Sequence, residues 1–264
     1  MQDRYVGDIG DYGKYGLLRW LTGMRQVDDR GGLCLGINWY LFDEGPLPPN
    51  NDGGFTQYLF NPSSAERSLP DCDPTLYAAM RHIVDADRRY VAEVEGSGVL
   101  PPDTLYHSAS LNFDHTPRPQ RESVRQAWLT DGLAALDGAD LVFVDPDNGL
   151  ENPRTRRYSK KGPKYTYYDD LPPYWKRGQS LIIYQHANHT IGGIEALVAD
   201  RCAELRERLP GANPVTLGFH RSSARVYLIV AQPRHAGLLD GRIHSFLDSE
   251  WGKGANPHFT RAEC

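Results

Sequence analysis

The sequence lacks long hydrophobic runs and an excess of positive charge. No apolar stretch in its 264 residues approaches the roughly 20 residues that a membrane-spanning helix needs. The first residues, MQDRYVGDIGDYGK, are polar and acidic and do not resemble a signal peptide. The formal net charge is −5, so there is no overall positive field to attract a polyanion. We therefore expect no membrane partner, and any nucleic-acid binding must come from a local patch.

Cysteine is also scarce. The four cysteines, Cys34, Cys72, Cys202 and Cys264, lie far apart and form no C-x-x-C pair. This spacing argues against a structural zinc site and against a disulfide framework. We expect a reduced, cytoplasmic protein. Nothing in the sequence specifies its oligomeric state.

Predicted strands and helices alternate along the chain. Apolar runs predict strands at 32–42, 104–111, 140–145 and 180–186, and residues 214–232 predict two strands around a polar turn. Helices are predicted at 11–22, 74–95, 121–136 and 191–209. This alternation predicts right-handed crossovers and a mostly parallel sheet with helices on both faces. We expect one three-layer, Rossmann-like α/β domain over 1–264, with a C-terminal antiparallel strand and a long loop insertion at about 43–72.

Three polar segments follow predicted strands. They are FDEGPLPPNNDGG after the first strand, DPDNGLE after 140–145 and QHANHT after 180–184. In open α/β sheets, ligands bind outside the carboxyl ends of the strands. Because three separate segments are predicted to meet at that edge, we expect the functional site there.

The segment DPDNGLE contains the strongest single candidate. Turn formation explains Pro146, Asn148 and Gly149. It explains Asp145 poorly, because a carboxylate directly after Leu-Val-Phe-Val is partly desolvated and needs a partner or a ligand. Asp145 and Asp147 are therefore catalytic candidates, and Glu151 follows them as a possible metal ligand.

Two histidines and a basic cluster add to this edge. His186 and His189 can act as acid and base or ligate a metal, although a histidine at a strand end is more often only hydrogen-bonded. A charge run is most often a solvated loop, but here aromatic residues interrupt it, which suits phosphate and base contacts. The candidate substrate-binding residues are Arg154, Arg156, Arg157, Lys160, Lys161, Lys164 and Tyr165.

The N-terminal segment YVGDIGDYGKYG is rich in glycine and contains Asp11 and Lys14. It matches neither the P-loop nor the G-x-G-x-x-G pattern. Either this segment is a turn in which Asp11 caps the first helix, or its glycines allow the backbone to approach a ligand closely.

The order of these features resembles the Rossmann-like class I methyltransferases that use S-adenosylmethionine. In layout it is closest to the large-subunit ribosomal RNA adenine-N6 methyltransferases. The resemblance implies that Gly10 to Lys14 lie over the cofactor or target base, and that Asp145-Pro146 begins the Asp-Pro-Pro-aromatic motif that holds the adenine amine. It also implies cofactor contacts from the segment after the first strand and from the N-terminal turn, which here offer Asn38, Asp43, Glu44 and Asp11.

The sequence departs from that family at two places. Asp147 and Asn148 stand where the family has a proline and an aromatic residue that stacks on the flipped base. Bulky residues also follow the first strand, where the family has a glycine-rich turn.

Three hypotheses therefore remain open. In the first, the chain methylates a nucleic acid or nucleotide with S-adenosylmethionine; Asp145 orients the target amine, and Asp43 or Glu44 holds the cofactor. Across the hypotheses, the catalytic candidates are Asp145, Asp147, His186 and Lys14. In the second, it is a nuclease or phosphodiesterase that uses Mg²⁺ or Mn²⁺. The third is a non-catalytic binding module. The metal ligands under the second hypothesis would be Asp145, Asp147, Glu151, His186 and His189.

Overall fold

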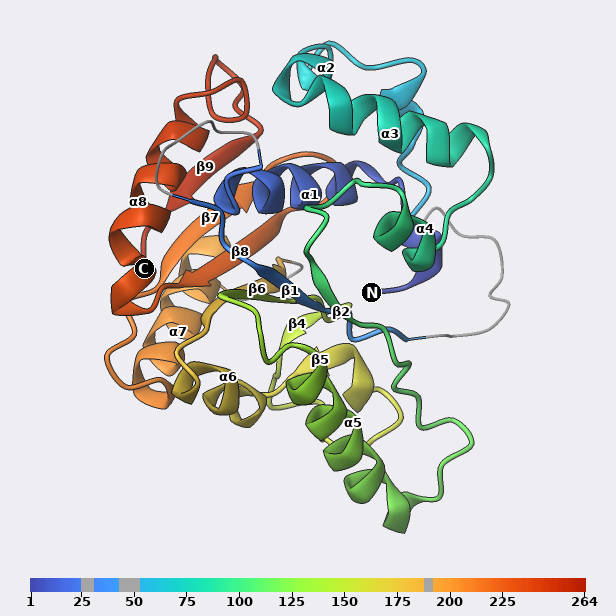
Figure 1. Cartoon of the computed structure of the whole chain (residues 1–264), viewed down its shortest axis with the longest axis vertical. Helices are drawn as coiled ribbons and strands as arrows, with labels where there is room; N and C mark the ends of the chain where they lie inside the picture. The colour runs from blue at the N-terminus through green and yellow to red at the C-terminus, as the bar shows by residue number, and fades with distance from the viewer. Residues whose placement is uncertain (25–30, 43–52, 188–191) are drawn as a thin grey trace.

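Seven strands form one mixed sheet in the computed structural model, which describes residues 1–24, 31–42, 53–187 and 192–264. The strand order is β2-β1-β3-β6-β8-β7-β9 (Figure 1). β2, β1, β3 and β6 run parallel, β8 runs antiparallel to β6, and β7 and β9 continue the antiparallel part. The strands are β1 Leu35–Asn38, β2 Leu105–His107, β3 Leu141–Val144, β6 Ser180–His186, β7 Val215–Phe219, β8 Arg225–Val230 and β9 Phe259–Ala262.

Helices cover both faces of this sheet, as the alternation of elements predicted (Figure 1). α1 (Ile9–Leu21), α3 (Pro74–Asp85) and α8 (Pro233–Leu247) lie on one face. α5 (Arg121–Ala135), α6 (Pro172–Lys176) and α7 (Gly193–Arg208) lie on the other. The chain therefore has an α/β fold with a seven-stranded mixed sheet, which is compatible with a Rossmann-like layout.

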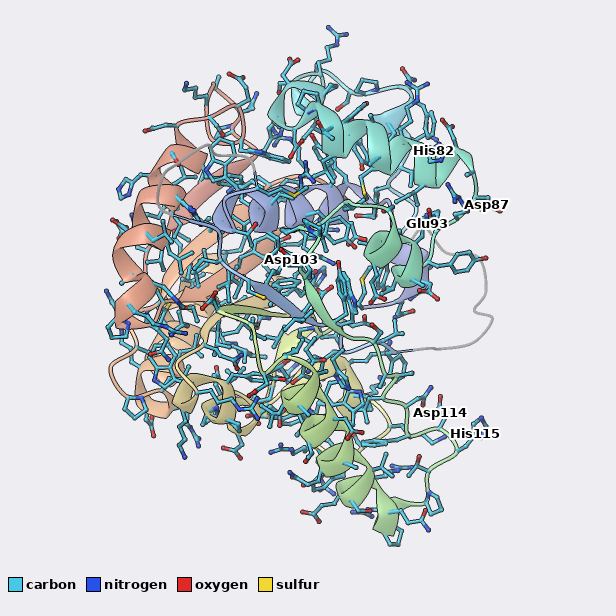
Figure 2. The ribbon with its side chains drawn as sticks, viewed as in Figure 1. His82, Asp87, Glu93, Asp103, Asp114 and His115 are labelled. Carbon is cyan, nitrogen blue, oxygen red and sulfur yellow. A yellow bond between two sulfur atoms is a disulfide. The ribbon has the colours of Figure 1, made fainter. Side chains whose placement is uncertain are left out.

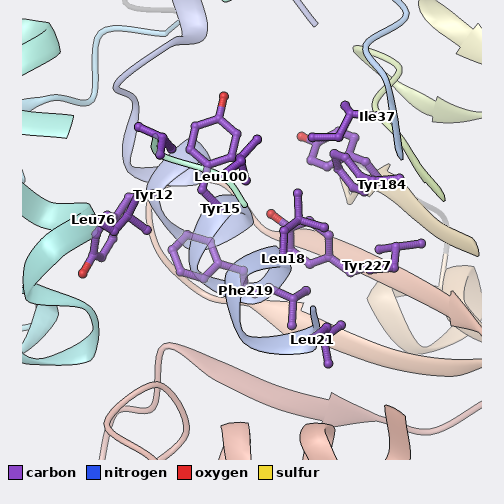
Figure 3. Close-up of a cluster of buried hydrophobic side chains, with 14 of the residues drawn as sticks. Tyr12, Tyr15, Leu18, Leu21, Ile37, Leu76, Leu100, Tyr184, Phe219 and Tyr227 are labelled. Carbon is purple, nitrogen blue, oxygen red and sulfur yellow. The ribbon is translucent and has the colours of Figure 1, made fainter. Parts of the chain in front are cut away.

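The interior strand β3 is buried on both faces. Leu141 and Phe143 belong to the core on the α1 side, and Val142 and Val144 belong to the core on the α5 side. Successive side chains of a strand point to opposite faces, so a continuous apolar run supplies both cores. Figure 3 shows part of the first core, where side chains of α1 such as Leu18 lie beside Phe219 and Tyr227 of the sheet.

Several predicted elements differ from the structure. The helix predicted at 74–95 is wrong as one element, because α3 ends at Asp85 and a separate helix, α4, spans Val91–Gly96. Asp87, between them, has a φ of 53°, a left-handed conformation that a right-handed helix excludes. The strand predicted at 32–42 shortens to the four residues of β1. The sequence pattern missed α8 and β9.

A small two-stranded sheet follows β3. In it, β4 (Gly149–Leu150) pairs in parallel with β5 (Tyr165–Thr166). Gly149 has a φ of 100°, and a Cβ there would come within 2.7 Å of the Gln185 side chain, so only glycine fits. The loop 151–164, which carries most of the basic cluster, connects the two strands β4 and β5 of this small sheet.

The predicted insertion at 43–72 is described from residue 53 onward. There it contains a short 3-10 turn, Gln57–Leu59, and a short helix, α2 (Leu69–Cys72). Tyr58 and Leu59 are buried in the core on the α1 side. This part of the insertion therefore packs on the domain.

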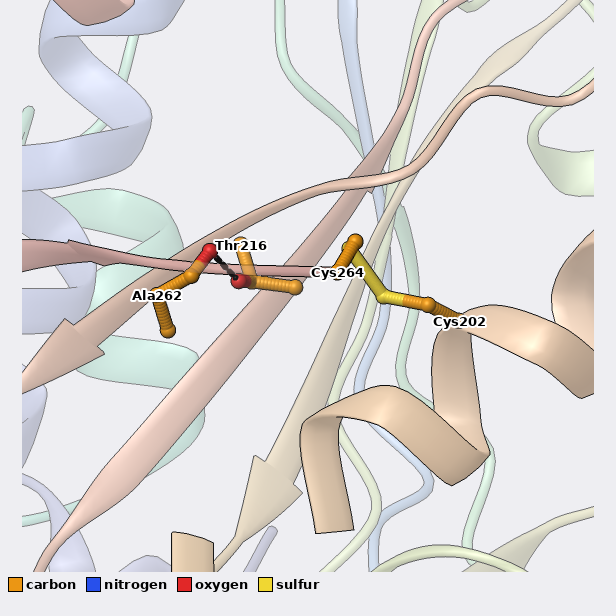
Figure 4. Close-up of a disulfide and its surroundings, with 4 residues drawn as sticks. All are labelled: Cys202, Thr216, Ala262 and Cys264. Carbon is orange, nitrogen blue, oxygen red and sulfur yellow. Dashed lines mark hydrogen bonds between the residues drawn. A yellow bond between two sulfur atoms is a disulfide. The ribbon is translucent and has the colours of Figure 1, made fainter. Parts of the chain in front are cut away.

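The expectation of a reduced chain is wrong for one pair of cysteines. A disulfide joins Cys202 of α7 to Cys264, which follows β9 (Figure 4). Thr216 Oγ1 also donates to the Ala262 carbonyl at 2.6 Å and holds the same end of β9 against β7. The spacing of the cysteines could not reveal this pair, because only the pairing of β9 with β7 brings Cys264 to α7. No helix within the described residues is long and apolar enough to cross a membrane.

We expect Cys264→Ser to lower the free energy of unfolding by about 2–4 kcal/mol, because the cross-link restricts the unfolded chain. Urea denaturation without reductant measures this difference, and it should vanish when reductant is added. Cys34→Ser, at a cysteine outside the disulfide, is the matched control and should leave the midpoint unchanged. Equal midpoints for Cys264→Ser and the parent chain without reductant would contradict the prediction.

Candidate functional site

A hollow of ≈ 210 Å³ opens at the carboxyl edge of the parallel strands. The register aligns Asn38, Val144 and Ile183, so β1 and β3 end side by side and β6 continues beyond them to His186. Around the hollow lie the amino end of α1, the turn after β3, the end of β6 and the start of β8. The lining residues are Met1, Tyr5, Asp8, Gly10, Asp11, Lys14, Gly53, Phe55, Asp145, Pro146, Asp147, Asn148, Tyr184, His186, Ser223 and Arg225.

The centre of this site is an ion triad that joins α1 to β3. Lys14 Nζ lies 2.7 Å from Asp145 Oδ2 and 2.8 Å from Asp11 Oδ1. The side chains of all three residues are no more than 5% exposed. Tyr15 donates its hydroxyl to Asp11 Oδ2 at 3.2 Å. The partner that the sequence required for Asp145 is therefore Lys14.

Burial and charge act in opposite directions on these groups. Burial lowers the pKa of Lys14, but Asp11 and Asp145 more than offset it, so the pKa of Lys14 is raised and the ammonium stays charged. Burial raises the pKa of Asp11 to about 6, and Lys14 only partly opposes that shift. Asp11 can therefore exchange a proton near neutral pH, as a general acid or base must.

Asp147 has a different set of cations around it. Its Oδ1 lies 2.9 Å from the Met1 amino group, and its Oδ2 accepts from Gln2 Nε2 at 2.5 Å. Lys164 Nζ lies 3.8 Å from Oδ2. Burial works to raise the pKa of Asp147, but the Met1 amine, Gln2 and Lys164 outweigh it and lower that pKa. Asp147 is therefore a fixed anion.

Arg225 closes the hollow on the side of β8. Its guanidinium lies 3.0 Å from Asp8 Oδ1, and Asp8 caps α1 by accepting from the Gly10 amide. A Cβ on Gly10 would come within 2.2 Å of the guanidinium, so glycine is what lets Arg225 lie against the helix end. His186 pairs with Arg225 across the β6–β8 ladder, and its Nδ1 lies 3.1 Å from the Tyr184 hydroxyl. Each of the carboxylates Asp8, Asp11, Asp145 and Asp147 in the hollow thus lies beside a cation.

The structure brings together only part of the set predicted from sequence. Asp11, Lys14, Asp145, Asp147 and His186 line the hollow. Asp43, Glu44 and His189 lie outside the described residues.

The predicted cofactor residue Asn38 does not reach the hollow. It is fully buried behind it, where Nδ2 donates to the Tyr174 hydroxyl and Oδ1 accepts from the Tyr40 amide. The next two residues, Trp39 and Tyr40, are also fully buried and fill the turn after β1.

The described residues do not assemble the metal site of the second hypothesis. Glu151 turns away from the hollow and accepts from the Tyr168 amide at 2.9 Å. Asp145 and Asp147 each already lie beside a cation. Within the described ranges, no group of three or more His, Cys, Asp or Glu side chains is arranged to hold a metal ion.

The basic cluster divides between two places. Lys164 lies at the hollow, beside Asp147 and 4.9 Å from the ring of Phe42. Arg156, Arg157 and Lys160 line a second, larger groove beside α5. Arg154 and Lys161 are exposed, and Tyr165 is half-buried in β5.

Sequence reasoning missed four residues that shape the hollow. Asp8 and Arg225 are 217 positions apart, and no local pattern links them. Tyr5 and Phe55 put aromatic rings at its rim, where Phe55 is 46% exposed. Among these, only Asp8 had a local signal, since an aspartate directly before an apolar-periodic segment is a typical helix cap.

Comparison with known proteins identifies no relative: no family, no curated protein and no solved structure matches this chain.

We expect Lys14→Met to lower the free energy of unfolding by about 3–5 kcal/mol, because it leaves two buried carboxylates without their shared cation. Urea denaturation at pH 7 measures the loss. Lys161→Met removes an exposed lysine and should change stability by less than about 0.5 kcal/mol. Adding Asp11→Asn to Lys14→Met should recover part of the lost stability, because it removes one of the two unpaired carboxylates. No recovery would contradict the stabilising role of the triad.

We expect Asp11 to titrate near pH 6 in the folded protein, against an ordinary 3.8. The folded state then binds a proton more tightly than the unfolded state, so ionisation of Asp11 destabilises the fold as pH rises from 3.8 to about 6. Carbon-detected NMR of the Asp11 carboxyl group measures the midpoint. A titration midpoint near the ordinary value of 3.8 would contradict the prediction, because it would show that burial does not raise the pKa of Asp11.

Proposed function

We propose that the chain is an enzyme of the methyltransferase-like α/β class that transfers a methyl group from S-adenosylmethionine to a nucleic acid or nucleotide. The observation that carries this proposal is the insertion of β8, antiparallel, between β6 and β7, with a polar hollow at the carboxyl ends of β3 and β6. The resemblance implied an antiparallel strand beside the last parallel one, and β8 lies antiparallel beside β6. Asp145 and Pro146 line the hollow.

The residues of the hollow fit the charged end of S-adenosylmethionine. Its amino-acid group is a zwitterion that would insert into the existing ion pairs, with its carboxylate facing Lys14 and Arg225 and its ammonium facing Asp8 and Asp11. The volume of ≈ 210 Å³ is below the roughly 300–1,000 Å³ of pockets that enclose whole drug-sized ligands. We therefore assign the hollow to one part of the cofactor and the reacting group.

When bound, the cofactor supplies an electrophilic methyl group. The chain's own residues would orient the acceptor and manage its proton. Asp145 is rigid, because Lys14 holds its Oδ2 and β1 holds its backbone amide at 3.0 Å. A fixed carboxylate can accept a hydrogen bond from the acceptor amine and can then take the proton that the amine loses when the methyl group is transferred.

The experiment is a titration calorimetry series with S-adenosylmethionine and, in parallel, with Mn²⁺. We expect micromolar cofactor binding, weakened about tenfold or more by Asp11→Asn, because one charge partner of the ammonium is lost. Asp137→Asn, at an exposed carboxylate, is the matched control and should bind as the parent does. No heat with the cofactor, together with Mn²⁺ binding that needs Asp145 and Asp147, would overturn the proposal in favour of a metal-dependent phosphodiesterase.

A further inference from the structure

A second concave site lies beside α5. It is a groove of ≈ 670 Å³ whose lining is rich in positive charge. Four of its residues are arginines and one is lysine, against a single carboxylate, Glu122. The lining residues are Arg118, Pro119, Arg121, Glu122, Arg156, Arg157, Tyr158, Ser159 and Lys160.

Two segments far apart in the sequence build the walls of this groove. One wall is the short turn Arg118–Gln120 with the start of α5, and the other is the tip of the loop 151–164. Arg121 Nη1 donates to the Tyr158 carbonyl at 3.1 Å, and the Tyr158 hydroxyl donates to Glu122 Oε1 at 3.0 Å. These bonds cross the groove and fasten the loop tip to the helix.

Internal carboxylates cancel only part of the charge in the groove. Arg157 pairs with Asp170, a fully buried side chain. Lys160 lies 3.5 Å from Asp114, which Figure 2 labels. Within the described residues, Arg118, Arg121 and Arg156 form no ion pair. Arg121 instead donates to carbonyl groups and lies 5.7 Å from the ring of Phe113. Three arginines of the groove therefore have no ion-pair partner within the described residues, and Glu122 is the single carboxylate among the lining residues.

A charge run is most often only a solvated face, but two features of this groove go beyond that explanation. The cations converge from two separate segments, although the net charge of the chain is −5. Arginine also predominates over lysine, and its planar fork binds phosphate through two parallel hydrogen bonds. Tyr158 adds an aromatic ring to the lining, on which a base can stack.

We propose that this groove binds the phosphate backbone of a nucleic-acid strand and that the acceptor is therefore a polymer. This inference rests on the proposed function for its acceptor. The base of the loop that forms one wall contacts the lining of the hollow. There the Asn148 amide donates to the Lys164 carbonyl at 3.0 Å, and Asn148 lines the hollow. Lys164 in turn lies beside Asp147 in the hollow. A strand in the groove is thus held by a loop whose base contacts the turn that lines the reacting site.

The test is fluorescence anisotropy with labelled single-stranded and double-stranded oligonucleotides, without cofactor, over a range of salt concentrations. Arg118→Glu/Arg156→Glu reverses two exposed charges that make no internal ion pair. We expect it to weaken binding about tenfold or more and to reduce the salt slope by about 2, because each lost phosphate contact removes nearly one unit. The single-stranded and double-stranded arms identify the form of the strand.

Arg67→Glu/Arg206→Glu is the matched control, because it makes the same change in net charge at exposed arginines outside the groove. It should bind oligonucleotides within about twofold of the parent chain. Equal losses in the two double variants, or no binding of either oligonucleotide by the parent, would overturn this inference. Groove-dependent binding in a chain that gives no heat with S-adenosylmethionine would instead leave the groove standing and remove the proposed reaction.

Discussion

The burial of Lys14 between Asp11 and Asp145 is the constraint on which the rest of the site depends. Two carboxylates this close repel each other. Burial also removes several kcal/mol of solvation free energy from each of them, and a shared cation offsets about this cost. Lys14 comes from α1, and Asp145 ends β3. The triad therefore fixes the amino end of α1 over the carboxyl edge of the sheet, and this position creates the hollow.

The other charged groups around the hollow follow from that position. With α1 fixed, its cap Asp8 reaches Arg225 at the start of β8, and glycine at position 10 leaves room for the guanidinium. The Met1 amine reaches Asp147 in the turn after β3. Asp8, Asp145 and Asp147 are thus each held by a cation from another part of the chain. A network of this kind is rigid, and rigidity is what a site needs in order to present charge in a fixed direction to a reacting group.

The same turn after β3 connects the two concave sites. The β4–β5 ladder starts within five residues of Asp145 and sends out the loop whose tip forms one wall of the arginine-rich groove. Substrate binding and chemistry would thereby share one short segment.

The sequence by itself determined the alternation of strands and helices, the burial of β3 on both faces and the choice of Asp145 as the main candidate. These depend on local periodicity and on the cost of burying a charge, both of which are visible in a short segment. Only the tertiary structure decided that Lys14 is the partner of Asp145, that Asn38 is buried behind the hollow, that Arg225 completes it and that Cys202 bonds to Cys264. The reason is physical: each of these contacts joins segments distant in the chain, and strand order and register, which no local pattern encodes, set which of them meet.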